Sequence, residues 1–172
     1  MIGAHWHHPA CLPPEELLKQ CSVLTGRSGG PGGQNRNKVE TLVELTHTPT
    51  GVATHAGERR SQMENKRVAL TRLRLALALE VRTAVPLGEI GSALWRSRCS
   101  GGRIACNPAH EDFPALLAEA MDVLAAMAWE PSKAALRLDT SPSQLVKLLK
   151  DHPPALLRLN RERLAQKKHP MK

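Results

Sequence analysis

Apolar residues recur at helical spacing from residue 61 to about residue 82, which predicts one helix of about 33 Å at 1.5 Å per residue. One apolar stripe of this helix is suited to cover a sheet and consists of Ala69, Leu70, Leu73, Ala76, Leu77 and Val81. A second stripe on the opposite side consists of Val68, Leu75 and Leu79. Because both sides are apolar, we expect the helix to be sandwiched between an N-terminal sheet and part of the C-terminal half.

Three short strands are predicted ahead of this helix, at residues 22–25, 41–47 and 52–55. The last two are joined by the sequence TPTG, in which proline presets φ and glycine accepts a positive φ, so we expect a hairpin there. A short helix is expected at residues 14–21, because a proline and two glutamates open that segment. These elements predict an α+β fold in which a small mixed β-sheet packs on one long helix.

The second half of the chain has a helical pattern throughout. Asp112 is expected to cap a mostly buried helix at residues 113–129. Residues 141–144 (SPSQ) have the form of a capping box with proline at the first helical position, and they predict a helix that ends near Lys150. A last helix is expected at residues 154–166. We therefore expect the sheet and its long helix to be followed by a helical C-terminal subdomain.

The chain is expected to have four parts. They are an N-terminal lead-in helix (1–21), a sheet-and-helix domain (22–82), a linker rich in Gly, Pro and Ser (83–112) and a helical basic C-terminal region (113–172). Residues 145–172 contain eight Lys or Arg against two acidic residues. Positive charge is thus concentrated at the end of the chain.

The composition narrows the class of partner. The 172 residues include 24 Lys or Arg against 16 Asp or Glu, a formal net charge of +8 that favours a polyanionic partner. Aromatic residues make up 2% of the chain, which weighs against RNA readers that stack bases on aromatic side chains. No apolar run reaches the roughly 18 residues of a membrane span, and no signal or transit peptide pattern is visible, so a cytoplasmic protein is expected. The four cysteines are expected to be free thiols.

The segment of residues 27–37 (RSGGPGGQNRN), within the longer stretch 27–41 (RSGGPGGQNRNKVET), has a composition that excludes regular structure. Four glycines and one proline fall within five positions, so we expect an exposed loop between two strands. Glycine backbone allows close approach to another molecule. A Gly-Gly-Gln triplet alone is common turn chemistry and would not identify a function.

This loop resembles the catalytic loop of class I peptide-chain release factors and of the shorter ribosome-rescue peptidyl-tRNA hydrolases. A second segment, Glu58-Arg59-Arg60-Ser61-Gln62 with Asn65, Lys66, Ala69 and Leu70, resembles the start of the long helix in the same domain. The two segments lie at the family's spacing and the resemblance covers residues 20–82, so residues 22–82 are expected to be the catalytic domain with the GGQ motif. One position departs from the family pattern, since Asn35 stands where the family most often has histidine.

The resemblance implies that Gly32, Gly33 and Gln34 are catalytic residues in hydrolysis of the ester that joins a nascent peptide to tRNA. Gln34 would direct its backbone N–H at the developing oxyanion, and its side chain would admit water while excluding larger nucleophiles. One such donor contributes roughly 2.7–4 kcal/mol to transition-state stabilisation. The first half of the sequence offers no Ser-His-Asp set and no paired carboxylates. The resemblance accounts for this, because the ribosome and the 2′-hydroxyl of the substrate would supply the acid–base environment.

Cations near the loop, on the long helix and in the C-terminal region are candidate contacts for RNA phosphates. The candidates are Arg27, Arg36, Lys38, Arg59, Arg60, Lys66, Arg67, Arg74, Arg158, Arg161, Lys167 and Lys168. On the long helix, Arg67 and Arg74 share one arc with Thr71 and Arg82. A solvated charged surface is the alternative interpretation.

Full release factors carry further domains that read stop codons, and only about 21 residues precede the matching region here. We therefore expect codon-independent release, which rescues stalled ribosomes or large subunits that still hold peptidyl-tRNA. The expected partners are the peptidyl transferase centre of the large ribosomal subunit, peptidyl-tRNA and rRNA, with no membrane partner, no cofactor, no metal and a monomer off the ribosome. The alternative is a non-catalytic ribosome- or rRNA-binding factor with the same fold.

Two groups of metal-ligating residue types do not have the paired spacing of a structural zinc site. They are His5, His7, His8 and Cys11 in one group, and Cys99, Cys106 and His110 in the other. Accidental clustering is the better interpretation of both. The last two helices are similarly interpreted as ordinary helical packing in place of a helix-turn-helix motif.

Overall fold

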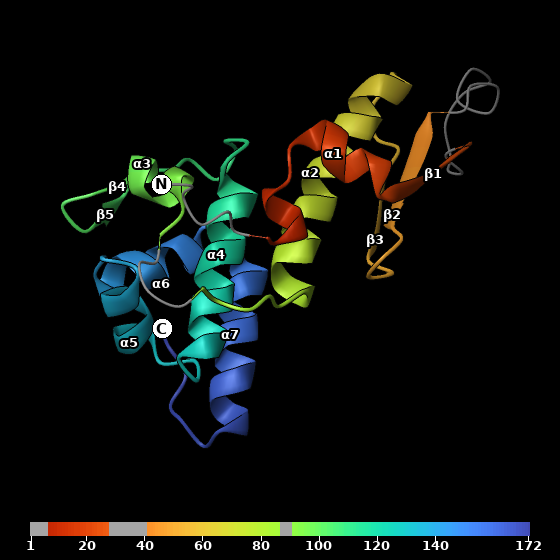
Figure 1. The fold of residues 1–172 in the computed structure, drawn as a ribbon. Coiled ribbons are helices and arrows are strands. Elements are labelled where there is room, and N and C mark those ends of the chain that lie inside the picture. The colour runs from red at the N-terminus through yellow and green to blue at the C-terminus, as the bar shows by residue number, and fades with distance from the viewer. Residues whose placement is uncertain (1–6, 28–40, 87–90) are drawn as a thin grey trace.

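The computed structural model describes residues 7–27, 41–86 and 91–172. One long helix lies at the centre, with a small sheet on one side and a group of helices on the other (Figure 1). The N-terminal elements are the 3-10 helix η1 (Pro9–Cys11), α1 (Pro14–Lys19), β1 (Cys21–Gly26), β2 (Leu42–His47), β3 (Ala53–Ala56) and α2 (Gln62–Glu80). The remaining elements are α3 (Ala93–Arg98), β4 (Cys99–Ser100), β5 (Arg103–Ile104), α4 (Phe113–Ala126), α5 (Pro131–Arg137), α6 (Pro142–Lys150) and α7 (Pro153–Ala165).

The sheet on α2 has the order β1-β2-β3, and both neighbouring pairs are antiparallel. Cys21 lies opposite His47 and Gly26 opposite Leu42, so β1 pairs with β2 along its whole length. The turn between β2 and β3 has Gly51 at φ +73°, as the TPTG sequence predicts. The α+β fold class is confirmed, with both described pairings antiparallel in place of the expected mixed sheet.

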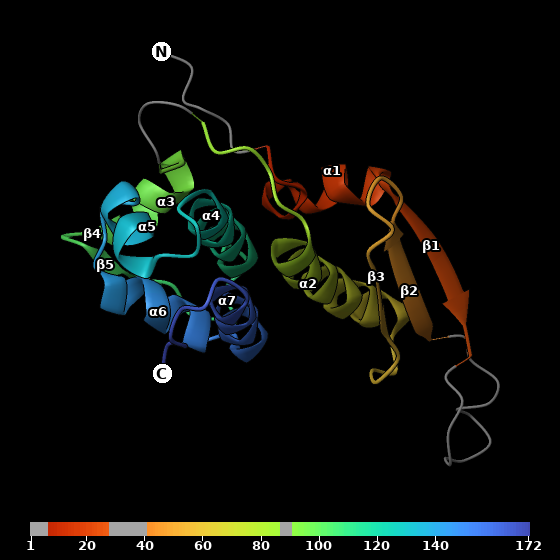
Figure 2. The ribbon, with the colours of Figure 1, turned by 90° about the horizontal axis from the view of Figure 1, so that it is seen from below.

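The prediction that α2 is sandwiched is confirmed. Val43 and Leu45 of β2 are buried against one side of α2, where Leu73 and Leu77 have no exposed surface. Figure 2 shows α2 between the sheet and α4. Val68, Leu75 and Leu79, the second stripe, are half-buried and pack against the core. One contiguous core therefore joins the sheet, α2 and the C-terminal helices.

The predicted linker contains secondary structure in its described part. Ser92 caps α3 by accepting a hydrogen bond from Trp95 N, and Gly101 and Gly102 adopt the positive φ values of a tight turn between β4 and β5. Trp95 is buried and its indole N–H donates to Leu138 O at 2.9 Å. Serine and glycine serve here as cap and turn residues. The division of the chain into four parts stays a prediction.

The start of α4 differs from the prediction. Asp112 makes no capping hydrogen bond with its side chain, because its carboxylate accepts two bonds from Arg98, at 2.5 and 3.0 Å. The helix is mostly buried, as predicted, and it ends at Ala126 because Ala128 and Trp129 adopt positive φ. The expectation of a side-chain cap at Asp112 is wrong. By contrast, the capping serine before α6 is confirmed, since Gln144 N donates to Ser141 Oγ.

The four cysteines are free, which confirms that prediction. None of the helices in the described ranges combines the length and the apolar character needed to cross a bilayer.

Candidate functional site

The candidate catalytic residues Gly32, Gly33 and Gln34 lie in residues 28–40, outside the described residues, as do the candidate cations Arg36 and Lys38. What the structure describes is the base of this segment. Residues 28–40 connect β1 to β2, and the last pair of the β1–β2 ladder joins Gly26 to Leu42. The predicted catalytic loop is therefore attached to two adjacent antiparallel strands.

A buried amide lies beside the point where the loop segment rejoins the sheet. Asn65, in the first turns of α2, has no exposed surface. Its Nδ2 group donates to Thr41 O at 2.6 Å and to Arg59 O at 3.0 Å, and its Oδ1 accepts from Arg59 N at 2.9 Å. One side chain thus joins the residue before β2, the segment before α2 and α2 itself.

The start of α2 is held by a cap and by an ion pair. Ser61 Oγ accepts from Glu64 N, which satisfies one of the free N–H groups of the first turn. Arg72 binds Glu58 at 2.7 Å and also donates to His55 O of β3 at 2.8 Å. The pKa of Glu58 is held below its ordinary value. The carboxylate accepts hydrogen bonds from the backbone N–H groups of Glu58 itself and of Gly57, and Arg72 adds to this effect. The segment between β3 and α2 is thereby tied at both of its ends.

Five of the predicted RNA-binding cations lie near this base and are exposed. They are Arg27 at the end of β1, Arg59 and Arg60 before α2, and Lys66 and Arg67 in α2. None of them makes an ion pair with another residue of the described ranges. Within the described ranges no acidic side chain pairs with these cations, which remain candidates for phosphate contacts.

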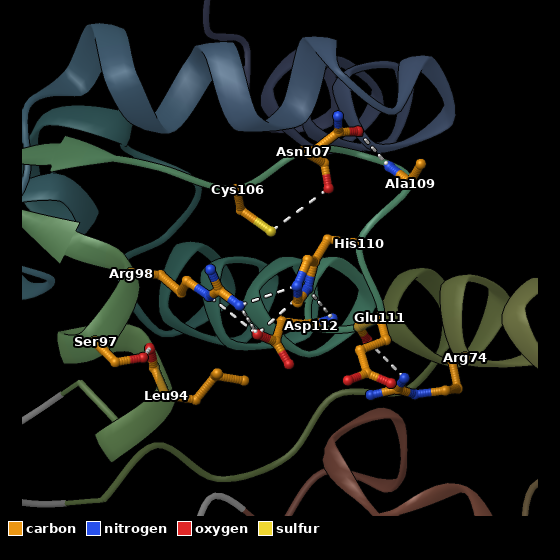
Figure 3. A network of polar contacts seen from close by, with 10 residues as sticks. All are labelled: Arg74, Leu94, Ser97, Arg98, Cys106, Asn107, Ala109, His110, Glu111 and Asp112. Atoms are coloured by element: carbon orange, nitrogen blue, oxygen red, sulfur yellow. Dashed lines mark hydrogen bonds and ion pairs between the residues drawn. The ribbon is translucent and has the colours of Figure 1, made fainter.

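Arg74 has a different environment from the other candidate cations of α2. Its Nε donates to Ala10 O at 3.0 Å. Its Nη1 donates to Glu111 O at 2.7 Å (Figure 3). Burial lowers the pKa of Arg74. Its guanidinium therefore holds η1 and the segment before α4 against α2.

Arg82, which shares the predicted arc with Arg74, is also held internally. Its Nη1 lies 2.9 Å from Asp122 Oδ1 of α4, and its Nη2 donates to Ala78 O. Thr83 donates to the same carboxylate through both its N–H and its hydroxyl. Asp122 is one of two acidic residues in the otherwise apolar sequence of α4, and an isolated carboxylate in a buried helix was the available sequence signal for this network.

The C-terminal candidates also divide into two groups. Arg158 lies 2.9 Å from Glu162 and 3.7 Å from Glu80, and Lys168 lies 2.8 Å from Glu130. Arg161 and Lys167 are exposed and form no ion pair within the described part of the chain.

The possible metal ligands do not form a site in the described ranges, where no group of three or more His, Cys, Asp or Glu residues could hold an ion. His8 is buried and bonded to backbone, with Ala10 N donating to its Nδ1. Burial raises the pKa of Cys11 to about 12, so its thiol is protonated at neutral pH and is a poor metal ligand. His5 lies outside the described residues.

Comparison with known proteins places this region in one family. Residues 17–87 match the RF-1 domain. The chain is 47% identical over 81 residues to peptide chain release factor PrfB1, chloroplastic, of Arabidopsis thaliana, which covers 46% of this chain and 17% of that protein. It is 53% identical over 63 residues to peptide chain release factor 1 of Chlorobaculum tepidum, which covers 37% of this chain and 16% of that protein. It is 49% identical over 93 residues to peptide chain release factor 1 of Akkermansia muciniphila, which covers 54% of this chain and 24% of that protein.

The chain therefore spans at most about a quarter of the length of these relatives. The similarity is concentrated in the sheet, α2 and the loop segment between β1 and β2. Residues 17–87 belong to the RF-1 domain family of the class I peptide-chain release factors.

Proposed function

We propose that this protein hydrolyses the ester of peptidyl-tRNA on the ribosome, with Gly32, Gly33 and Gln34 as the catalytic residues. The observation that carries the proposal is the Gly-Gly-Gln sequence between β1 and β2 of a domain that matches the RF-1 family over residues 17–87. The proposed partners are the large ribosomal subunit, its rRNA and peptidyl-tRNA.

In the proposed reaction, water attacks the ester carbonyl carbon and the ribose oxygen of the tRNA leaves as a hydroxyl group. The products are a peptide with a free carboxylate and a deacylated tRNA. The backbone N–H of Gln34 stabilises the oxyanion of the tetrahedral intermediate. At the described base of the loop, Glu58 is paired with Arg72, and the exposed Glu64 lies in the first turn of α2. We assign proton transfer to the RNA environment and not to these side chains.

We further propose that release does not depend on a stop codon. Support comes from the C-terminal helical region, which packs on α2 and presents Arg161 and Lys167, two exposed cations that form no ion pair within the described part of the chain. Such a region is suited to contact RNA phosphates without reading a sequence.

The first experiment measures peptide release from ribosomes stalled on a truncated mRNA. Gly33→Ala adds a methyl group that should displace the backbone N–H of Gln34, so it should lower the release rate on the order of 10²- to 10³-fold, as much as losing one oxyanion donor. Gly26→Ala is a matched control, because the added methyl group would meet only Leu42 Cδ2, at an ordinary 3.7 Å. Equal release by wild type and Gly33→Ala would reject the catalytic assignment and leave the alternative of a ribosome-binding factor.

The second experiment varies the codon. Ribosomes that hold the same peptidyl-tRNA are prepared with a stop codon, with a sense codon or with no mRNA beyond the P site. Similar release rates on all three would support codon-independent release. Release confined to the stop codon would reject that subtype while leaving the hydrolytic reaction in place.

A further inference from the structure

The geometry of Asn65 goes beyond a general stabilising contact. Both N–H donors of its amide group are used, in bonds to two carbonyls, and its oxygen accepts one N–H, so three of its four hydrogen-bonding sites are filled. The partners are separated in sequence, since Thr41 is 24 residues away and Arg59 is six residues away. The side chain is fully buried, so water cannot replace these bonds at low cost.

We propose that Asn65 is a positioning residue for the release reaction, a role that rests on the function proposed above. Its bond to Thr41 O fixes the backbone where the segment containing Gln34 rejoins the sheet, one residue before β2 begins. Thr41 lies just beyond the last pair of the β1–β2 ladder, Gly26 with Leu42, so the bond from Asn65 continues the fixed backbone past the end of that ladder.

The same amide also fixes the backbone of Arg59, one of the exposed cations that are candidates for phosphate contacts. Asn65 therefore sets the position of the loop base relative to a part of the domain that would rest on RNA. Misplacement of a reacting group by about 1 Å can lower a rate by about 100-fold. The role of Asn65 should thus lie in the maximal rate of release and not in ribosome affinity.

Thr54 provides a matched control for a merely structural effect. Its hydroxyl donates to Ala69 O at 2.9 Å, so it also ties the sheet to α2, one helical turn beyond Asn65. Thr54→Val removes this bond without touching Thr41 or Arg59. A variant that acts only through stability should behave like Thr54→Val.

The test compares wild type, Asn65→Asp, Asn65→Ala, Thr54→Val and Gly33→Ala in release from stalled ribosomes over a range of protein concentrations. Asn65→Asp keeps the shape and the acceptor for Arg59 N but removes both donors, and it directs a carboxylate at two carbonyls. Both Asn65 variants should lower the maximal rate about 10- to 100-fold. The half-saturating concentration should stay within about twofold of wild type, since no phosphate contact is removed. Thr54→Val should keep the wild-type maximal rate.

A second measurement on the free protein does not require activity. Amide hydrogen exchange at Arg59 should become faster in Asn65→Ala, which loses the acceptor, and the carbonyl ¹³C shift of Thr41 should change in both Asn65 variants. Neither signal should change in Thr54→Val. Unchanged signals in the Asn65 variants would overturn the anchoring geometry.

The outcomes separate the two proposals. If Gly33→Ala abolishes release and the Asn65 variants release at the wild-type maximal rate, the positioning role is wrong and the proposed function stands. If the Asn65 variants change only the half-saturating concentration, Asn65 acts on binding and the positioning role is also wrong. If wild type and Gly33→Ala release equally, the proposed function is wrong and the positioning role falls with it.

Discussion

Along α2, cations at the two ends lie in opposite surroundings. Lys66 and Arg67, near the N-terminal end, are exposed and make no ion pair with other described residues. Arg74, further along, and Arg82, just beyond the C-terminal end, are half-buried and bonded to η1 and α4. The N-terminal end has the sheet on one side and solvent on the other, whereas η1, α4 and α7 surround the C-terminal end (Figure 2). The elements that pack on a helix thus decide whether its cations meet solvent or hold the fold together.

The contrast has an energetic basis. A charge that is removed from water needs a close partner and complete hydrogen bonding. Burial lowers the pKa of Arg82, and the nearby Asp122 carboxylate opposes that shift. Asp122 in turn accepts from Arg82 and from the N–H and hydroxyl of Thr83. Substitutions at the C-terminal end of α2 should therefore cost more stability than substitutions at its N-terminal end.

The largest effect is expected at Asp122. Asp122→Ala should lower the free energy of unfolding by about 3–5 kcal/mol, because it leaves the half-buried guanidinium of Arg82 without its carboxylate. Urea denaturation measures the loss. The control is Glu16→Ala, which breaks the exposed pair between Glu16 and Lys19 and should cost about 0–1 kcal/mol. Similar losses in the two variants would show that the Asp122 network adds no more than a surface ion pair.

A smaller effect is expected from arginines on α2. Arg74→Met removes two hydrogen bonds from a charged group to backbone carbonyls and should lower the free energy of unfolding by about 1.5–3 kcal/mol. Arg67→Met, on the exposed side, should change it by less than about 0.5 kcal/mol. Both variants have the same change in charge and side-chain type. Equal losses would contradict the division of α2 into a packed and an open end.

These two arginines also show the limits of sequence reasoning. A helical wheel places Arg67 and Arg74 on one arc, but it cannot show that η1 and the segment before α4 lie against the second of them. The same limit explains the wrong cap at Asp112, since Arg98 lies 14 residues away and takes its carboxylate. Contacts between residues far apart in sequence depend on the tertiary packing.

Local patterns were predicted well where they carry their own physical signal. The strands, the turn at Gly51, the cap at Ser141 and the two stripes of α2 follow from turn chemistry, capping and periodicity. The secondary structure in the described part of the predicted linker was harder to predict from the sequence, because serine and glycine are common in loops and also at helix caps and hairpin turns. In the candidate site, the motif is local and was identified, whereas the bond of Asn65 to Thr41 spans 24 residues and was not.

Acidification should weaken the packed end of α2 through His8. Burial lowers the pKa of His8 below the ordinary histidine value of about 6.5. Ala10 N donates to its Nδ1, while its Nε2 bonds Val81 O just after α2. The folded protein favours neutral His8, so its contribution to stability is present above about pH 6.5 and is lost as the pH falls through the lowered pKa. Urea denaturation between about pH 7.5 and pH 5 should show this loss.

His8→Gln is the control for this pH effect, because glutamine keeps a donor and an acceptor without titrating in this range. The variant should show a shallower loss of stability on acidification. Some loss should remain, since burial also lowers the pKa values of His47 and His152. Identical pH profiles for wild type and His8→Gln would remove His8 from this explanation.

The smallest effect on stability is expected at the open end of α2, where a binding measurement is the sharper test. Lys66→Ala and Arg67→Ala should each change the free energy of unfolding by less than about 0.5 kcal/mol, because neither side chain is paired within the described ranges.

If these cations neutralise phosphates, each substitution should weaken ribosome association and reduce the slope of log affinity against log salt concentration by about 1. Association measured between about 50 and 200 mM salt gives that slope. Lys133→Ala on α5 removes an equally exposed charge far from the loop base in the sequence. An equal change of slope in Lys133→Ala would mean that net charge alone drives association, so the open end of α2 would be solvated surface.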